Sequence, residues 1–275
     1  MQPVALVTVD QIRKMSYTSF LGFINQWNIP PGSISTVSEW AVFGRVGQRS
    51  KVLEMACTTG FTGRELALLT GCTVRGIDLC RDSIDMALYN HRHYAPSCKL
   101  SYECCNAYDF SPKSKFSHVI LGACLAFFPD PNRLMQKCIS VLKDGGIMLT
   151  SPYYLASKKL PARLIARCKT TIGIYPTNVP YKEAMRPYRD LEIVYESRKD
   201  IVGETREEME KYCTDTISRA CVLRRIERGE VRDAVYRRLY QIKDVSNELH
   251  KRHAYSVLVL RNRKKVYPAR YVELF

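Results

Sequence analysis

The sequence predicts an α/β protein: a mainly parallel β-sheet with helices on both faces. Between residues 51 and 151, short apolar stretches typical of strands alternate with stretches of helical periodicity. In addition, His118–Leu125 contains almost no polar residue, as expected for a strand that is buried on both faces. Both features are typical of β-α-β units, which place the strands of one sheet in parallel.

Two helices are predicted before this alternation begins. In residues 9–26 the apolar side chains recur at roughly helical intervals. The sequence NIPPG at Asn28–Gly32 then breaks the helix. Thr36 and Glu39 have the spacing of a capping box, which predicts that a second helix opens there and runs to about Val46.

The alternating region contributes the predicted strands and helices of the core. The strands are Lys51–Cys57, Thr73–Leu79, Leu100–Cys105, His118–Leu125 and Gly146–Ser151. The helices are Gly63–Thr70, Asp82–Tyr94 and Pro131–Leu142.

The pattern is looser after residue 151. The predicted elements there are a basic helical stretch at Ala156–Lys169, a strand at Leu191–Arg198, two long charged helices at Glu204–Arg228 and Glu230–His250, and a strong final strand at Tyr255–Leu260. We therefore expect an N-terminal helical cap (residues 1–50), a core (51–202 and 253–275) and a second helical cap (203–252) inserted before the last strand.

The composition excludes several classes of protein. Of the 275 residues, 46% are hydrophobic and 25% are charged, so the chain has enough apolar surface to fold and is not mainly disordered. No apolar run approaches the roughly 20 residues of a membrane span, and the N-terminus lacks the features of a signal peptide. The 11 cysteines include no CxxC pair, which favours free thiols in a reducing cytoplasm and no metal site.

The net charge of +15 lies mainly in the second half of the chain. Such an excess favours an anionic partner, either an acidic substrate or nucleic acid. The alternative is a solvated basic surface without a specific partner. The sequence does not indicate an oligomeric state.

The segment Lys51–Asp78 has the organisation of a nucleotide-binding unit. A strand ends in a turn with Gly60 and Gly63, a helix begins, and a second strand ends in an acid. Small residues let the backbone approach a ligand at the helix N-terminus, and Asp78 stands where a carboxylate accepts hydrogen bonds from ribose hydroxyls. Glu54, just before the turn, would repel a pyrophosphate and suits a cationic ligand.

Four motifs in order resemble class I S-adenosylmethionine-dependent methyltransferases. VLEMACTTGFTG resembles the first motif, GIDLC the second and ECCNAYDF the third, and Lys115–Tyr154 is similar to the fourth strand, helix and fifth strand of the family. More weakly, the overall pattern resembles the methyltransferases that esterify carboxylates in peptide natural-product pathways. The resemblance implies a Rossmann-like seven-stranded sheet whose last strand, Tyr255–Leu260, is antiparallel.

The resemblance also implies S-adenosylmethionine as cofactor, S-adenosylhomocysteine as product, and a set of cofactor-binding positions. These are Glu54, Ala56, Thr58, Gly60, Asp78, Leu79, Asn106, Ala107, Gly122 and Tyr17. The sequence departs from the first motif at Ala56 and Thr58, where the family has glycine, and Thr58 is expected to narrow the loop. A scaffold that has lost cofactor binding is therefore an alternative.

Candidate substrate residues come from the caps and from the stretch after the fifth strand. They are Phe20, Tyr153, Tyr154, Arg219, Tyr236 and Tyr240, and Asn25 is a further candidate to close over the cofactor. No histidine follows the fourth strand, so a histidine base is disfavoured and no catalytic residue is assigned. A carboxylate acceptor needs no base, only positively charged groups that hold it, and the basic residues Arg219, Arg224, Arg237 and Lys243 of the second cap are expected to supply the charge.

We therefore expect O-methylation of a carboxylate on a peptide or small natural product. One alternative is a small-molecule hydroxyl, nitrogen or carbon methyltransferase. Another is an RNA methyltransferase or a nucleic-acid-binding scaffold that uses the basic half. Nucleic acid is the less favoured partner, because no amino-methylating NPPY-type motif follows the fourth strand.

Overall fold

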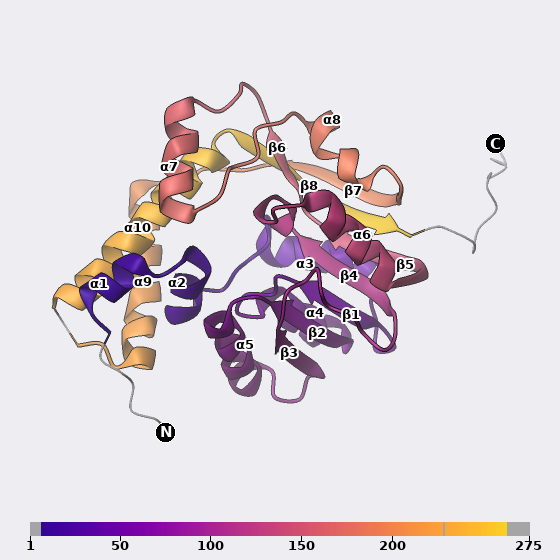
Figure 1. Ribbon diagram of the computed structural model, residues 1–275, viewed down its shortest axis with the longest axis horizontal. Helices are drawn as coiled ribbons and strands as arrows, with labels where there is room; N and C mark the ends of the chain where they lie inside the picture. Colours follow the sequence, from indigo (N-terminus) through magenta and orange to yellow (C-terminus); the bar gives the residue numbers. More distant parts are fainter. Residues whose placement is uncertain (1–6, 228, 263–275) are drawn as a thin grey trace.

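A mixed sheet forms the centre of the molecule (Figure 1). The computed structural model describes residues 7–227 and 229–262. The strands are β1 Lys51–Met55, β2 Thr73–Asp78, β3 Leu100–Cys104, β4 Phe116–Gly122, β5 Leu142–Thr150, β6 Tyr153–Leu155, β7 Glu192–Asp200 and β8 His253–Arg261. Their order is β3-β2-β1-β4-β5-β8-β6, with β7 on the other side of β8.

The expected α/β class and Rossmann-like sheet are confirmed, with one additional strand. β1 to β5 are parallel, and β8 is antiparallel to β5, β6 and β7. The short β6 follows β5 and pairs with the first residues of β8, whereas β5 pairs with its last residues. The sheet therefore has eight strands in seven positions, because β5 and β6 share one side of β8.

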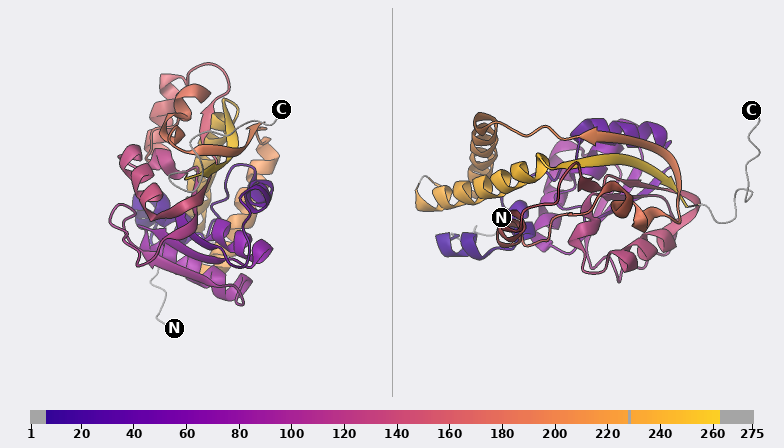
Figure 2. Two further views of the ribbon diagram at one scale, coloured as in Figure 1. Left: turned by 90° about the vertical axis from the view of Figure 1, so that its right-hand side faces the viewer. Right: turned by 90° about the horizontal axis from the view of Figure 1, so that it is seen from above.

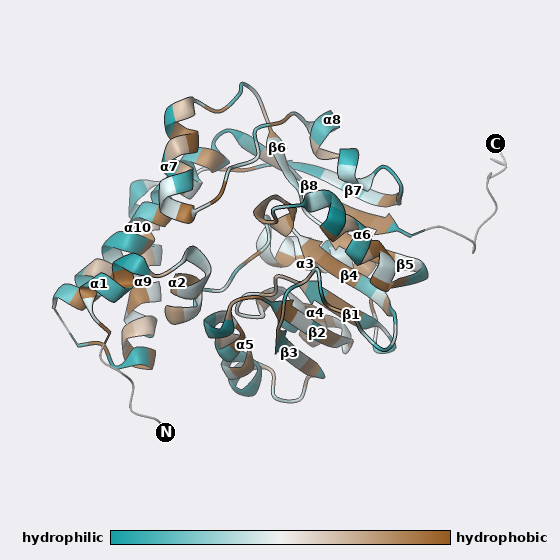
Figure 3. Cartoon of the chain, viewed as in Figure 1, coloured by the Kyte–Doolittle hydropathy of each residue, from teal (hydrophilic) through white to brown (hydrophobic). Residues whose placement is uncertain are grey.

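Helices cover both faces of the sheet (Figure 2). α3 (Ser33–Phe43) and α4 (Phe61–Thr70) bury Trp40 and Leu66 against one face. α6 (Pro131–Val141) buries Leu134 and Cys138 against the other. α5 (Arg81–Tyr94) packs beside β2 and β3. In Figure 3 the central strands β4 and β8 are mainly hydrophobic, whereas α6 also carries hydrophilic residues.

A separate group of helices lies beyond the carboxyl ends of the parallel strands (Figure 1). It comprises α1 (Val9–Lys14), α2 (Tyr17–Phe23), α7 (Ala162–Ile172), α9 (Arg206–Arg224) and α10 (Glu230–His250). We call it the helical unit. Its interior contains Ile12, Phe20, Cys213, Ile217 and Leu239. Among the described residues, no helix is long and apolar enough to cross a membrane.

The N-terminal prediction was wrong in two details. Residues 9–26 form two helices, because the side chain of Ser16 accepts the amide of Ser19 and starts α2. The capping box at Thr36 does not exist: α3 begins at Ser33, and the Thr36 hydroxyl donates to the carbonyl of Pro31. The predicted N-terminal cap is also not one unit: α1 and α2 belong to the helical unit, whereas α3 packs on the sheet.

Some helices and strands begin or end at other residues than the sequence predicts, because turns occupy the ends of the predicted elements. The fourth strand is Phe116–Gly122, because Gly122 takes a positive φ of 53° and a 3₁₀ turn follows at Cys124–Phe127. The basic helix starts at residue 162, after Pro161, instead of at 156. α9 ends at Arg224. The remaining short elements are α8 (Tyr181–Ala184) and a 3₁₀ turn at Arg186–Tyr188. The final residues of the predicted core, 263–275, lie outside the described residues.

Two arginines join the N-terminal helices to the C-terminal ones. The Arg224 guanidinium donates to the carbonyls of Phe23 (2.8 Å) and Gly22 (3.1 Å) at the end of α2. Arg238 on α10 donates to the carbonyls of Ile12 and Met15 around the end of α1, and its guanidinium lies 4.5 Å from the centre of the Phe20 ring. These bonds bring charged donors to carbonyls at helix ends, where partners within the helix run out, although the Gly22 carbonyl also accepts the Asn25 amide.

We predict that Arg238→Met lowers the free energy of unfolding by about 2 kcal/mol, because it removes hydrogen bonds from a charged donor to partly buried carbonyls. Hydrogen exchange should show faster exchange in residues 9–24. Arg237→Met is the matched control, because Arg237 is exposed on the same helix. Equal stability of the two variants would contradict this role for Arg238.

Candidate active site

Glu54 is buried at the carboxyl end of β1, with 4% of its surface exposed. Its carboxyl accepts the amide of Gly63 at 3.1 Å, and a Cβ at Gly63 would lie 2.6 Å from the Glu54 Oε2. A glycine is therefore required for this approach. Burial raises the pKa of Glu54 to about 8, even though the Gly63 amide opposes the shift. The carboxyl is thus largely protonated at neutral pH.

The loop between β1 and α4 turns its backbone towards Asp78. Ala56 and Thr58 have positive φ values of 51° and 49°, and Gly60 has 76°. Asp78 Oδ2 accepts the amide of Thr58 at 2.9 Å, and Oδ1 accepts the amide of Cys80 at 2.8 Å. These bonds hold the carboxylate in one orientation at the carboxyl end of β2. Burial is the larger effect, and it raises the pKa of Asp78.

The ends of β2 and β3 add an apolar and a polar group. Leu79, directly after Asp78, is 73% exposed, which is unusual for leucine and suits contact with a flat ligand ring. Asn106 follows β3 and is also exposed. Its Oδ1 accepts the amide of Tyr108 at 3.0 Å, which leaves Nδ2 free to donate among the described residues. Ala107 beside it is buried.

At the end of β4, the backbone of Gly122 has unoccupied space beside it. A Cβ at Gly122 would meet no atom within 4 Å. The Gly122 carbonyl accepts the amide of Ser151 (2.7 Å) and the hydroxyl of Thr150 (2.8 Å). The chain after β5 is therefore fixed beside the end of β4. No group of three potential metal ligands occurs among the described residues.

A segment between α2 and α3, Asn25–Asn28, is bonded to the loop and to α5. Asn28 donates to the Thr58 hydroxyl at 3.0 Å, and the Thr59 hydroxyl donates to the Gln26 carbonyl at 2.8 Å. The amides of Asn25 and Asn90 exchange two hydrogen bonds of 2.9 Å.

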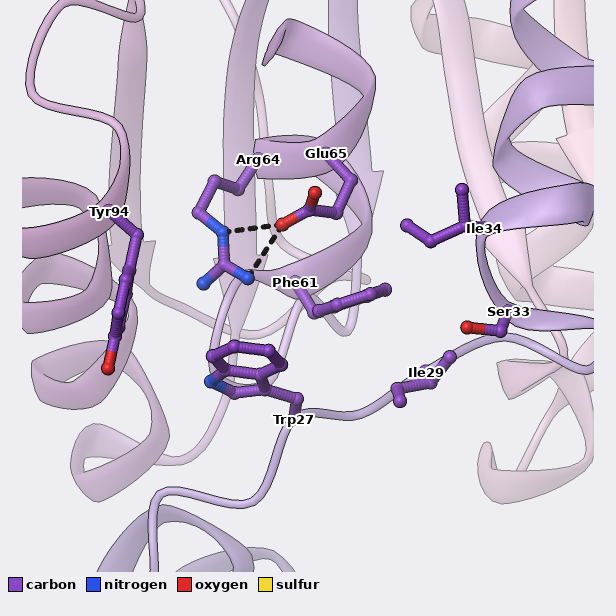
Figure 4. A pocket seen from close by; sticks show the side chains of 8 residues that line it. All are labelled: Trp27, Ile29, Ser33, Ile34, Phe61, Arg64, Glu65 and Tyr94. Carbon is purple, nitrogen blue, oxygen red and sulfur yellow. Dashed lines mark hydrogen bonds and ion pairs between the residues drawn. The ribbon is translucent and has the colours of Figure 1, made fainter. Parts of the chain in front are cut away.

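Trp27 in this segment packs over a buried guanidinium. Its ring lies 4.7 Å from the Arg64 guanidinium, which also faces Phe61 and Tyr94 at 5.4 Å each (Figure 4). Glu65 accepts two hydrogen bonds from the same guanidinium. A cavity of about 410 Å³ lies beside these residues. The aromatic contacts thus fix Trp27 to the start of α4.

Three titratable side chains lie around Tyr153 of β6, one of the residues expected on the substrate side, and with Tyr153 they form a group of four. The rings of His250 and His253 lie 6.4 Å and 5.9 Å from the Tyr153 ring, and Tyr17 of α2 is close enough to influence its pKa. Burial raises the pKa of Tyr17 to about 12 and raises that of Tyr153 too. It lowers the pKa of both histidines. All four groups are therefore neutral near pH 7.

The other predicted substrate residues lie elsewhere. Phe20 is fully buried inside the helical unit. Tyr154 points to the opposite face of β6, where its hydroxyl donates to the Tyr255 carbonyl. The Arg219 guanidinium lies 5.7 Å from the centre of the Trp27 ring, and Arg219 lines a pocket together with Tyr89 of α5. Tyr236 and Tyr240 stack on each other, and Tyr240 stands ten residues before His250, about 15 Å along the helix.

The position of His250 and His253 was missed by sequence reasoning, although the signal was present. Both precede the predicted last strand, Tyr255–Leu260, and that strand was expected to be antiparallel. An antiparallel strand starts at the edge where its parallel neighbours end. The two histidines therefore lie at the carboxyl edge of the sheet. The other histidines are engaged away from it: His118, for example, contacts the Gly44 carbonyl at 2.8 Å.

Comparisons with known proteins agree with this geometry. The family described as "Methyltransferase domain" matches residues 52–146, which is less than half of the chain. An uncharacterised protein of Haemophilus influenzae is 30% identical over 137 residues, or 48% of this chain, and the alignment spans only 54% of that relative. The chain thus matches about half the length of its curated relative.

Solved structures share the fold. The crystal structure of MccD protein has a TM-score of 0.69 at 21% identity and covers 86% of this chain and 100% of its own. A methyltransferase from Thiobacillus denitrificans in complex with S-adenosylhomocysteine has a TM-score of 0.64 at 15% identity, covering 88% and 96%. Residues 52–146 are therefore similar to a methyltransferase domain, and the solved structures share the fold. Both findings agree with the expected enzyme class and with S-adenosylmethionine as its cofactor.

The residues present fit this cofactor. Asp78 offers a fixed carboxylate to the ribose hydroxyls. Leu79 offers an apolar face to the purine, and Asn106 offers an amide. At Gly122 the backbone has free space beside it. The buried carboxyl of Glu54 is complementary to a cationic group. The cofactor, when bound, supplies an electrophilic methyl group on a positively charged sulfur.

We predict that binding of S-adenosylmethionine at pH 7 releases about one proton per site, because a cation near Glu54 lowers a carboxyl pKa that starts at about 8. Affinity should rise with pH and level off above about 8. Calorimetry in two buffers of different ionisation enthalpy measures the proton number.

Glu54→Gln is the matched variant, because it keeps the shape and removes the titration. It should release no proton and bind about tenfold more weakly. Proton release equal to that of the parent would show that another group titrates.

Proposed function

We propose that the chain transfers a methyl group to a carboxylate oxygen of a small molecule or peptide. The observation that carries this proposal is the pair of tyrosines on the substrate side, Tyr17 and Tyr153. Neither hydroxyl makes a hydrogen bond within the described part of the chain. Their raised pKa values keep both protonated, so both can donate.

The chemistry of a carboxylate acceptor matches such donors. A carboxylate is ionised at neutral pH and carries its own nucleophilic electron pair, so it needs orientation and no proton transfer. Neutral hydroxyl donors hold one oxygen without forming an ion pair that would quench the other. Tyr153 lies three residues after Thr150, which is bonded to Gly122. The strand that carries Tyr153 thus begins close to the end of β4.

The sequence suggested that cations of the second helical cap would hold an anionic substrate, but several of them bind other parts of the chain. Arg224 and Arg238 are occupied by helix carbonyls, and Lys243 forms an ion pair with Glu204. These cations stabilise the helical unit. The net charge of +15 still favours the approach of an anion at long range.

A hydroxyl acceptor is the second candidate, because of His250. Its imidazole has no hydrogen-bond partner among the described residues, and burial lowers its pKa. A neutral imidazole of this kind can take the proton of a hydroxyl. His253 is less suited, since its Nε2 contacts the Thr177 carbonyl at 2.7 Å.

The two candidates differ in pH dependence when the cofactor is saturating. For a carboxylate acceptor we expect a rate that is flat between about pH 6 and 9, since the acceptor is ionised throughout. For a hydroxyl acceptor the rate should rise with pH through a limb below 6.5, the usual pKa of histidine, and His250→Gln should abolish that limb.

We predict that Tyr153→Phe lowers kcat/KM for a carboxylate substrate by about 10- to 100-fold, because a hydrogen bond to a charged acceptor is lost. Tyr154→Phe is the matched control on the same strand, since its hydroxyl bonds a backbone carbonyl on the other face. A screen of carboxylic acids and peptides with S-adenosylmethionine supplies the substrate. The proposal fails if no carboxylate is esterified while hydroxyl compounds are.

A further inference from the structure

We propose that Thr58, which replaces a glycine of the motif it resembles, is a positioning residue that fastens the segment Asn25–Asn28 over the cofactor loop. The proposal rests on the proposed function, because it assumes that cofactor binds at this loop. It reverses the expectation from the motif, in which a threonine here narrows the loop and weakens binding.

The backbone at Thr58 carries a cost that its side chain offsets. A φ of 49° places Thr58 in the left-handed region, which glycine adopts readily and a β-branched residue does not. Its hydroxyl accepts a hydrogen bond from Asn28 Nδ2 at 3.0 Å and donates to the Ala56 carbonyl at 3.2 Å. Glycine would relieve the backbone and lose both bonds.

The hydrogen bond between Thr58 and Asn28 is one of several contacts that hold the segment Asn25–Asn28 to the loop and to the helices α4 and α5. The next residue along the loop, Thr59, binds the Gln26 carbonyl through its hydroxyl, and the Thr59 carbonyl accepts Asn90 Nδ2 at 3.0 Å. Trp27 packs on the guanidinium of Arg64 between these bonds (Figure 4). The hydrogen bond from Asn28 holds the end of the segment that leads to α3.

Thr58 also connects this attachment to the ribose carboxylate. Its amide donates to Asp78 Oδ2 at 2.9 Å, while its hydroxyl receives Asn28. One residue therefore orients Asp78 and holds the covering segment. Loss of the Thr58 side chain should loosen the Asn28 end of the segment, and cofactor should then leave faster.

The test measures binding of S-adenosylhomocysteine and hydrogen exchange in the full chain. We expect Thr58→Gly to raise the dissociation constant about five- to tenfold, mainly through faster dissociation, and to speed exchange in residues 25–28 without ligand. Thr58→Ser keeps the hydroxyl and should restore both. Asn28→Ala should reproduce Thr58→Gly, and the double variant should add little to either.

Ala56→Gly controls for backbone strain, because it relieves a φ of 51° and removes no side-chain hydrogen bond. Exchange in residues 25–28 should be as in the parent. If Thr58→Gly binds as tightly as the parent or more tightly, with unchanged exchange, Thr58 does not fasten the segment. If the parent itself does not bind S-adenosylhomocysteine, the proposed function fails, and the exchange data still decide whether Thr58 fastens the segment.

Discussion

Two buried carboxyl groups, Glu54 and Asp78, determine how the rest of the site is built. A carboxyl out of water is costly unless backbone amides satisfy it, and three amides converge here: Gly63 on Glu54, and Thr58 and Cys80 on Asp78. The Thr58 amide comes from the loop between β1 and α4, the Gly63 amide from α4 and the Cys80 amide from the turn after β2. Thr58 donates to Asp78 from a left-handed backbone conformation, so the glycine-like shape of the loop is kept where the residue is not glycine.

The remaining structure encloses this edge of the sheet. The helical unit reaches the sheet through α2, whose end is held by Arg224, and through α10, which leads directly into β8. This connection places His250 and Tyr153 opposite Tyr17. The cofactor side is thus built from loops of the core, whereas the substrate side is built from elements distant in sequence. Neutral hydrogen-bonding groups predominate there, and the nearby cations are used for packing.

The fold and the cofactor-binding residues could be predicted because each is encoded by a short, continuous stretch of the sequence. Glu54 and Asp78 each close an apolar stretch at a fixed spacing from a glycine turn. The helix break at Ser16 could not be seen, since the periodicity of the apolar residues continues across it. Thr36 had the right spacing for a cap, but the positive φ of Gly32 starts the helix earlier. The role of His250 depended on combining its place before a strand with the direction of that strand.

The central claim is that Asp78, held by the backbone amides of Thr58 and Cys80, is the ribose ligand of a functional cofactor site. The most direct test is a calorimetric titration of S-adenosylhomocysteine into the parent chain and into Asp78→Asn, with circular dichroism to establish that both are folded. Our account predicts a dissociation constant on the order of micromolar for the parent and at least about a tenfold loss in the variant. A folded parent chain without measurable binding, or a variant that binds equally well, would contradict it.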